Sequence, residues 1–314
     1  MQTFFLMTKR NIKLFFKDKG MFFASLITPI ILLVLYITFL ANIYKENFVS
    51  NIPQGIDLPS NIINGVVNGQ LSASLLAVCG ITVAFCANML MVTDKVNGSR
   101  KDFIITPAKK SSISMSYYVA TLITTLIVCL ISMGACFIYI GATGWFLSLT
   151  DVLLILIDVF LISMLGTALS SIINIFLTSQ GQISAVGTVV SAGYGFICGA
   201  YMPISQFSVI LQNILAFLPG TYGTSLIKNH FLNGTFREMA KYGFSSDAIE
   251  SIKSGLDCNI KFFGNTVSTG AMYGIMIGSI ALIIGLYILI NVLKSKKLSK
   301  HKKIIKYEKT NKNA

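Results

Sequence analysis

One acidic residue, Asp158, lies well inside a long apolar run that extends from Asp151 to Leu177. A carboxylate surrounded by hydrocarbon costs several kcal/mol unless it is paired or faces water, so Asp158 is a candidate functional residue by default. No basic residue shares its run, so we expect it to face a polar cavity or to contact a threonine or asparagine on a neighbouring helix. It also lies about two helical turns from the start of the run, and a tolerated polar contact is therefore the alternative. Asn88 is a weaker candidate of the same kind, for which a helix–helix hydrogen bond is the commoner use.

Residue patterns that carry catalysis are missing from the sequence. There is no G-x-x-x-x-G-K-[ST] phosphate loop, so we expect no ATP site in this chain. No HExxH pair and no Gly-x-Ser-x-Gly elbow occurs, and there are only two histidines. The six cysteines show no metal-ligand spacing, and five of them lie in apolar runs, where cysteine acts as a small hydrophobe. The sequence therefore predicts neither an enzyme nor a metal site, and no cofactor bound by this chain.

A basic segment, Asp94 to Lys110, reads DKVNGSRKDFIITPAKK and lies between two long apolar runs. The runs from Leu71 to Val92 and from Met115 to Ile140 are each long enough to cross a hydrocarbon core of ~30 Å, which takes ~20 helical residues. Gly98 with Ser99 suits the start of a short helix, and Pro107 suits its end. We therefore expect a compact charged helix at a membrane surface, held at both ends.

This segment resembles the cytoplasmic coupling segment of type-2 ABC transporter permeases. That family shows a charged pair, then Gly-Ser or Gly-Thr, an acidic residue, an apolar pair, and Thr-Pro or Ser-Pro. The matching positions are Asp94, Lys95, Gly98, Ser99, Asp102, Ile104, Ile105, Thr106 and Pro107. Phe103 with two isoleucines replaces the more usual leucines, and Arg100 with Lys101 makes the segment more basic than most.

The resemblance implies that this helix lies flat beneath the membrane and docks into a cleft of a separate ABC ATPase subunit. That partner would bind the ATP and Mg. The candidate residues for coupling are Arg100, Lys101, Asp102, Phe103, Ile104, Thr106 and Pro107.

Composition places the chain in a membrane. Of 314 residues, 54% are hydrophobic and 12% are charged, about half the charged fraction of soluble domains. We predict an all-α polytopic membrane protein whose six spans cover residues 21–41, 66–92, 115–140, 151–177, 183–202 and 268–293. Residues 1–20 should form an interfacial helix, with Phe4, Phe5, Thr8, Ile12, Phe15 and Phe16 on its apolar face and with Lys9, Arg10, Lys13 and Lys17 reaching toward lipid headgroups.

Two further segments are polar. Residues 205–267 are predicted to form a small external region that begins with a re-entrant or surface helix, and residues 294–314 a basic, disordered cytoplasmic tail. Of the lysines and arginines, 19 lie in the N-terminal helix, the coupling segment and the tail, and only six lie in the connections on the other side. Basic residues favour the cytoplasm, so both termini are expected there, in a cell membrane. The net charge of +13 is thereby explained without nucleic acid.

A second resemblance to the same family covers Gly199 to Gly234. The family shows a small-Gly element, an aromatic residue, Pro-Ile, a short apolar helix, Leu-Pro and a polar stretch that ends in Gly. The matching positions are Gly199, Tyr201, Pro203, Ile204, Leu218, Pro219, Tyr222 and Gly234. Lys228 and His230 stand where the family often has arginine. The resemblance implies a re-entrant helical hairpin at the outer face.

Small residues recur at intervals of four in two spans. Gly187, Ser191, Gly195 and Gly199 do so in the fifth span, and Gly270, Gly274 and Gly278 in the sixth. Such stripes let helices approach closely in lipid. The fifth-span stripe could contact a second permease half or line the transport route, or it could serve ordinary packing within one bundle, and packing is the more favoured interpretation for the sixth.

The sequence thus favours the permease subunit of an ATP-driven exporter, dimeric with an identical or related half, that moves an apolar or amphipathic drug, antibiotic or peptide. One alternative is an ATP-independent secondary transporter or channel, although such folds tend to carry internal repeats and several intramembrane charges. The other is a membrane assembly or sensor protein.

Overall fold

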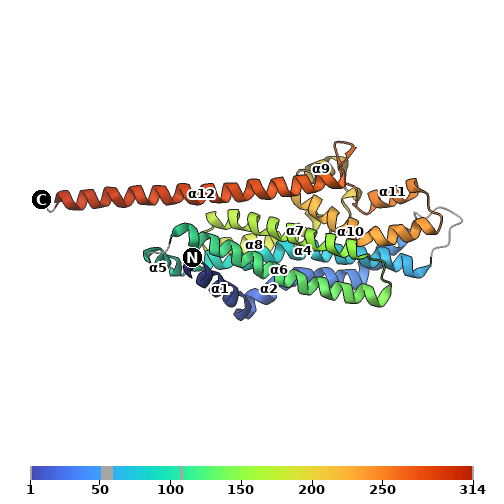
Figure 1. Ribbon diagram of the computed structural model, residues 1–314, viewed down its shortest axis with the longest axis horizontal. Helices are drawn as coiled ribbons and strands as arrows, with labels where there is room; N and C mark the ends of the chain where they lie inside the picture. Colours follow the sequence, from blue (N-terminus) through green and yellow to red (C-terminus); the bar gives the residue numbers. More distant parts are fainter. Residues whose placement is uncertain (1, 51–58, 107–108, 313–314) are drawn as a thin grey trace.

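The computed structural model describes residues 2–50, 59–106 and 109–312. These form a bundle of long helices that run nearly along one axis, with α12 extending far beyond one end (Figure 1). The helices are α1 (Gln2–Lys17), α2 (Lys19–Leu35), α3 (Ala41–Ser50), α4 (Ser60–Val96), α5 (Ser99–Ile105), α6 (Lys110–Thr143), α7 (Leu149–Phe176), α8 (Gln180–Ile197), α9 (Val209–Leu215), α10 (Pro219–Lys241), α11 (Ser246–Gly255) and α12 (Thr269–Lys312). A π-helical turn, Tyr36–Leu40, joins α2 to α3, and a 3-10 turn, Ile204–Gln206, precedes α9.

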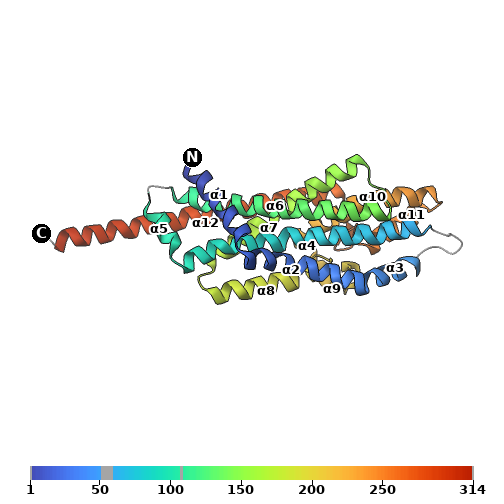
Figure 2. The ribbon, with the colours of Figure 1, turned by 90° about the horizontal axis from the view of Figure 1, so that it is seen from below.

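Helix α4 forms the centre of the bundle. It packs against α2, α6, α7, α8 and α10, and 94% of its most apolar window is buried inside the protein. Its sequence is apolar around the whole circumference, which is typical of a helix that is covered on every side. Helix α1 instead crosses α6 from outside, near the end of the bundle that carries α5 (Figure 2).

Five helical segments are long and apolar enough to cross a membrane. They are Lys19–Glu46, Ser60–Val96, Ser111–Thr143, Leu149–Phe176 and Thr269–Leu293. The all-helical, polytopic prediction therefore holds in its main feature, although a two-residue antiparallel pair, β1 (Lys261–Phe262) with β2 (Asn265–Thr266), is also present.

The predicted fifth span, 183–202, is not among these five segments. Helix α8 has 18 residues and ends at Ile197, because Gly199 takes a left-handed φ of +70° that a helix cannot continue through. Four glycines and two glutamines also lower its mean hydropathy. A count of six spans thus stays a prediction.

The segment from 205 to 267 is less peripheral than we expected. Helix α10 packs against α4, α7 and α12, and Lys228 on this helix is fully buried. Cys258, expected in a polar surface region, is also buried, and burial raises the pKa of its thiol to about 12. The polar sequence of α10 indicated an exposed helix. The helix is buried because its polar side chains find hydrogen-bond partners on other elements.

The C-terminal segment differs from the disordered tail that we predicted. Helix α12 continues through Lys312, and no proline or glycine between 294 and 312 interrupts it. Lysine is also a good helix former.

The two glycine stripes pack differently. A Cβ on Gly187 would lie 2.5 Å from Cε of Met89 on α4, and a Cβ on Gly195 would meet the ring of Tyr201. The fifth-span stripe therefore faces its own bundle, with Ser191 half-buried beside it. A Cβ added to Gly270, Gly274 or Gly278 would meet no neighbouring atom of the described residues within 4 Å, so the sixth-span stripe faces outward.

We predict that Gly234→Ala destabilises the protein by about 1–3 kcal/mol, the usual range for overpacking. Gly234 lets α10 approach the loop before α7, and an added Cβ would collide with the backbone carbonyl oxygen of Phe146. Gly274→Ala is the matched control: it has open space around it, and a helical Gly→Ala change is stabilising by roughly 0.5–1 kcal/mol. Thermal unfolding of both variants in detergent measures the difference, and equal stability of the two would contradict this packing.

Candidate functional site

Helix α5 forms at one end of the bundle, between the ends of α4 and α6 (Figure 1). The turn from α4 depends on Gly98, whose φ of +83° is a left-handed conformation that favours glycine. The helix ends at Ile105, where Thr106 donates a hydrogen bond of 2.7 Å from its Oγ1 to the carbonyl oxygen of Phe103. The short helix predicted between Gly98 and Pro107 is therefore present.

The structure describes only some of the candidate coupling residues. Asp102 and Thr106 are exposed, and Arg100 and Phe103 are half-buried. The side chains of Lys101 and Ile104 and the whole of Pro107 lie outside the described residues.

A charged network ties the start of this segment to the N-terminal helix. Arg10 of α1 forms two hydrogen bonds with Asp94, from Nη1 to Oδ2 at 2.7 Å and from Nη2 to Oδ1 at 3.1 Å. Tyr117 of α6 donates a hydrogen bond of 2.5 Å to Oδ2 of the same carboxylate. The guanidinium group also lies 4.9 Å from the ring centre of Phe103 on α5, in cation–π contact.

This geometry makes Asp94 the point where four helices are joined. A bidentate arginine–carboxylate pair is both strong and fixed in orientation, and Asp94 is only 5% exposed. The hydrogen bond with Asp94 raises the pKa of Arg10 above its ordinary value, so the guanidinium stays charged. Arg10 therefore points into the protein, and not toward headgroups as we predicted from the helix pattern.

Lys95, the other half of the charged pair, is directed at α7. Its Nζ donates to the carbonyl oxygens of Asn174 at 2.6 Å, Ile175 at 3.1 Å and Leu177 at 3.2 Å. Carbonyl groups at the end of a helix lack partners within it, and a cation there is favoured by the helix dipole. Asp94 thus fixes the end of α4 to α1 and α6, and Lys95 fixes it to α7. Helix α5 begins directly after this fixed end.

A second polar cluster surrounds Asp158 in the middle of the chain. Its Oδ2 lies 2.5 Å from Nδ1 of His230 on α10, and its Oδ1 accepts a hydrogen bond of 2.7 Å from the hydroxyl of Tyr273 on α12. The imidazole and phenol rings are stacked, with centroids 6.3 Å apart. Asp158 is 1% exposed. Both of its partners lie on helices distant in sequence, and neither is the threonine or asparagine that we expected.

Asn88 makes interhelical contacts as well. Its side-chain nitrogen donates to the hydroxyls of Ser170 at 3.0 Å and Ser171 at 2.9 Å, both on α7. No group of three or more His, Cys, Asp or Glu side chains able to hold a metal ion occurs within residues 2–50, 59–106 and 109–312.

A buried ion pair explains part of the second motif. Lys228 donates to Asp257 Oδ2 at 3.1 Å and to the carbonyl oxygen of Gly199 at 2.9 Å. Asp257 also accepts from the backbone nitrogens of Ile204 at 2.7 Å and Ser205 at 3.0 Å. The break after α8 is thereby held against α10, and the lysine performs a structural role that the sequence did not reveal.

We predict that Asp158 and His230 stabilise the protein as a unit. Asp158→Asn or His230→Gln alone should cost about 1–3 kcal/mol, because each leaves a buried polar partner incompletely satisfied. The double variant should cost less than the sum of the two, as measured by thermal unfolding in detergent in a double-mutant cycle. Tyr273→Phe, which removes one neutral donor, should have the smallest effect. Additive losses from Asp158→Asn and His230→Gln would show that the pair does not act together.

Comparison with known protein families agrees with the resemblance of the two motifs, Asp94 to Lys110 and Gly199 to Gly234. A family model described as ABC-2 type transporter matches residues 2–232, a range that contains α1, α5, the Asp94 network and most of α10. No curated protein and no solved structure matches the chain. Because the matched range covers well over half of the sequence and holds the predicted coupling helix, the chain belongs to the ABC-2 type transporter family and is a multi-pass type-2 ABC transporter permease.

Proposed function

We propose that this chain is the membrane-spanning subunit of an ATP-driven exporter that moves an apolar or amphipathic cargo, such as a drug, an antibiotic or a peptide. Two such halves work with two separate ATPase subunits, which bind ATP and Mg, in a cell membrane with both termini in the cytoplasm. The chain itself has no catalytic role. The observation that carries the proposal is the network of Arg10, Tyr117 and Asp94, which links the short helix α5 to three helices of the bundle.

The network supports a lever-like coupling. When the ATPase subunits close on ATP, they press on α5, which is attached to α4 through the turn at Gly98. Asp94 lies one helical turn before that turn, so α1 and α6 move with α4 through its hydrogen bonds. Packed helices shift between discrete arrangements and do not deform continuously, so a small displacement at α5 switches the bundle between inward-facing and outward-facing packing.

We expect Phe103→Asp to abolish coupling to the ATPase subunit. A carboxylate at this half-buried position would remove the cation–π contact, compete with Asp94 for Arg10 and remove the apolar ring from the surface offered to the partner. The experiment measures ATP hydrolysis by the copurified complex with and without cargo, and cargo stimulation should fall about tenfold or more. Ser246→Asp places the same charge on an exposed residue of α11 and should leave stimulation unchanged. Full stimulation in the Phe103 variant, or cargo movement with no ATPase subunit present, would contradict the proposal.

Arg10→Gln tests the role of α1 separately. It removes the bidentate pair, which should lower cargo-stimulated hydrolysis roughly fivefold, equivalent to about 1 kcal/mol of lost coupling. The ATPase subunit should still copurify, because Arg10 contacts α5 from the bundle side. Lys13→Gln, an exposed change on the same helix, is the control. A transport complex unaffected by Arg10→Gln would show that α1 carries no force.

A further inference from the structure

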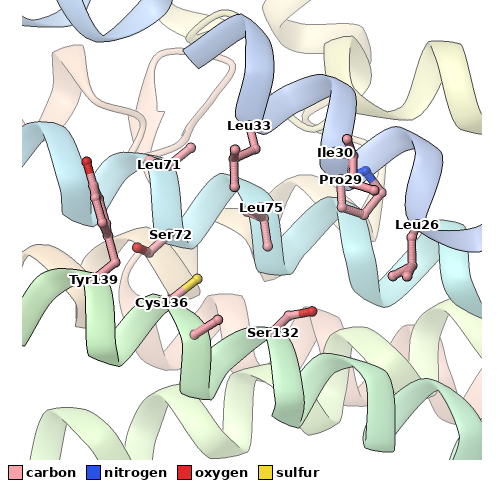
Figure 3. Close-up of a pocket in the computed structure, with 11 residues that line it drawn as sticks. Leu26, Pro29, Ile30, Leu33, Leu71, Ser72, Leu75, Ser132, Cys136 and Tyr139 are labelled. Carbon is pink, nitrogen blue, oxygen red and sulfur yellow. The ribbon is translucent and has the colours of Figure 1, made fainter. Parts of the chain in front are cut away.

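A cavity of about 350 Å³ lies between α2, α4 and α6 (Figure 3). Eleven side chains line it, and none of them is charged. All eleven belong to the three segments long and apolar enough to cross a membrane. The cavity therefore lies within the part of the bundle that is long and apolar enough to cross a membrane.

The cavity is closed on one side and open on the other. Its floor consists of buried residues, among them Leu71 and Leu75 of α4 and Cys136 of α6. Its rim carries exposed side chains, with Ile30 of α2 54% exposed and Tyr139 of α6 44% exposed. The mouth thus opens between α2 and α6 toward the lipid, and a ligand would enter from the bilayer.

The lining indicates the chemistry of that ligand. Most of the wall is aliphatic, which suits an apolar body, and pockets of this size hold small organic molecules. Two serines and a tyrosine add hydroxyls at a depth where an acyl chain has no polar atom to match them. The Ser132 hydroxyl lies 3.9 Å from Cys79 Sγ, a weak partner, and keeps the capacity for a stronger hydrogen bond.

The α2 wall of the cavity is the part most able to move. Only 29% of the apolar window of that span is buried, against 94% for α4. Pro29 removes a backbone donor in the middle of α2, and α1, which carries Arg10, precedes α2 directly. A shift of α1 would therefore change the width of the mouth while the floor on α4 stays in place.

We propose that this cavity binds a small neutral amphiphile drawn from the bilayer and is a holding site for cargo within one protomer. The inference rests on the proposed transport function. It concerns where the cargo is held and by what chemistry, and binding there does not require ATP.

The test uses a diazirine-bearing long-chain alcohol as the neutral amphiphile and a diazirine phospholipid as the competing lipid source. Each is photo-crosslinked to the full-length permease in membranes without nucleotide, and the modified residues are mapped by mass spectrometry. We expect the alcohol to label the floor around Leu71, Leu75 and Cys136, and the phospholipid to label only outward-facing positions such as Ile131 and Ile138, which are 69% and 78% exposed.

Ala135 provides the variant that fills the cavity. It lines the space from α6, so Ala135→Phe should reduce labelling of the floor by the alcohol about tenfold, and Ala135→Val should reduce it by less. Ile138→Phe, on the outward face of the same helix, should leave it unchanged. If Ala135→Phe does not fold, as judged by thermal unfolding, the graded loss in Ala135→Val decides the matter.

Three results would overturn the inference: unchanged floor labelling in the filled variants, equal labelling of the floor by the phospholipid, or uniform labelling of all exposed apolar positions. Because the assay contains no nucleotide, its failure would leave the coupling experiments on Phe103 and Arg10 untouched. Loss of coupling in those experiments would in turn leave the labelling result standing.

Discussion

The burial of α4 is the constraint on which the rest of the structure depends. On a helix that is covered on every side, a polar group costs free energy unless a neighbouring helix supplies its hydrogen-bond partner. Asn68 is bound by Thr143 at 2.8 Å, Asn88 contacts two serines of α7, and Asp94 binds Arg10. These contacts fix the rotation and depth of each neighbour relative to α4, so the order of the bundle follows from one helix.

The two ion-paired regions differ in what they hold. Asp94 and Lys95 fix the end of α4, next to helix α5, to α1 and α7. Lys228 and Asp257 instead fix an interrupted stretch of backbone after α8. Without Asp257, the backbone amides of Ile204 and Ser205 would lose their hydrogen-bond partner, which costs stability at buried positions. One pair therefore fixes the helix end next to α5, and the other stabilises an irregular region.

Features determined by a few neighbouring residues could be predicted from the sequence. Long apolar runs indicated five spans close to their observed positions, and Gly98 with Pro107 bounded a short helix that is present as α5. Partners far apart in the chain could not be predicted, since His230 lies 72 residues from Asp158 and Tyr273 lies 115 residues from it. Helix α10 was misjudged for the same reason: its polar side chains indicated exposure, whereas their partners on α7, on α12 and after α11 allow it to be buried. The only signal in the sequence of its buried partners was the presence of Lys228 and His230 in a stretch of otherwise ordinary composition.

The contrast between α2 and α4 has a mechanical consequence. A lever needs one element that resists deformation and another that can move against it. Here α4 is almost fully buried, whereas α2 is largely exposed. Helix α4 is held chiefly by α2, α6, α7, α8 and α10, so it resists bending. Helix α2 is held mainly by α4 and by its connection to α1, and it contains both Pro29 and, at its end, the π-helical turn at Tyr36–Leu40. Such interruptions weaken the regular hydrogen bonding of a helix and localise bending. Relative motion within the bundle should therefore concentrate at the α2–α4 contact, where the cavity between α2, α4 and α6 also lies. Under the proposed function, such motion would alter the space available to a bound molecule.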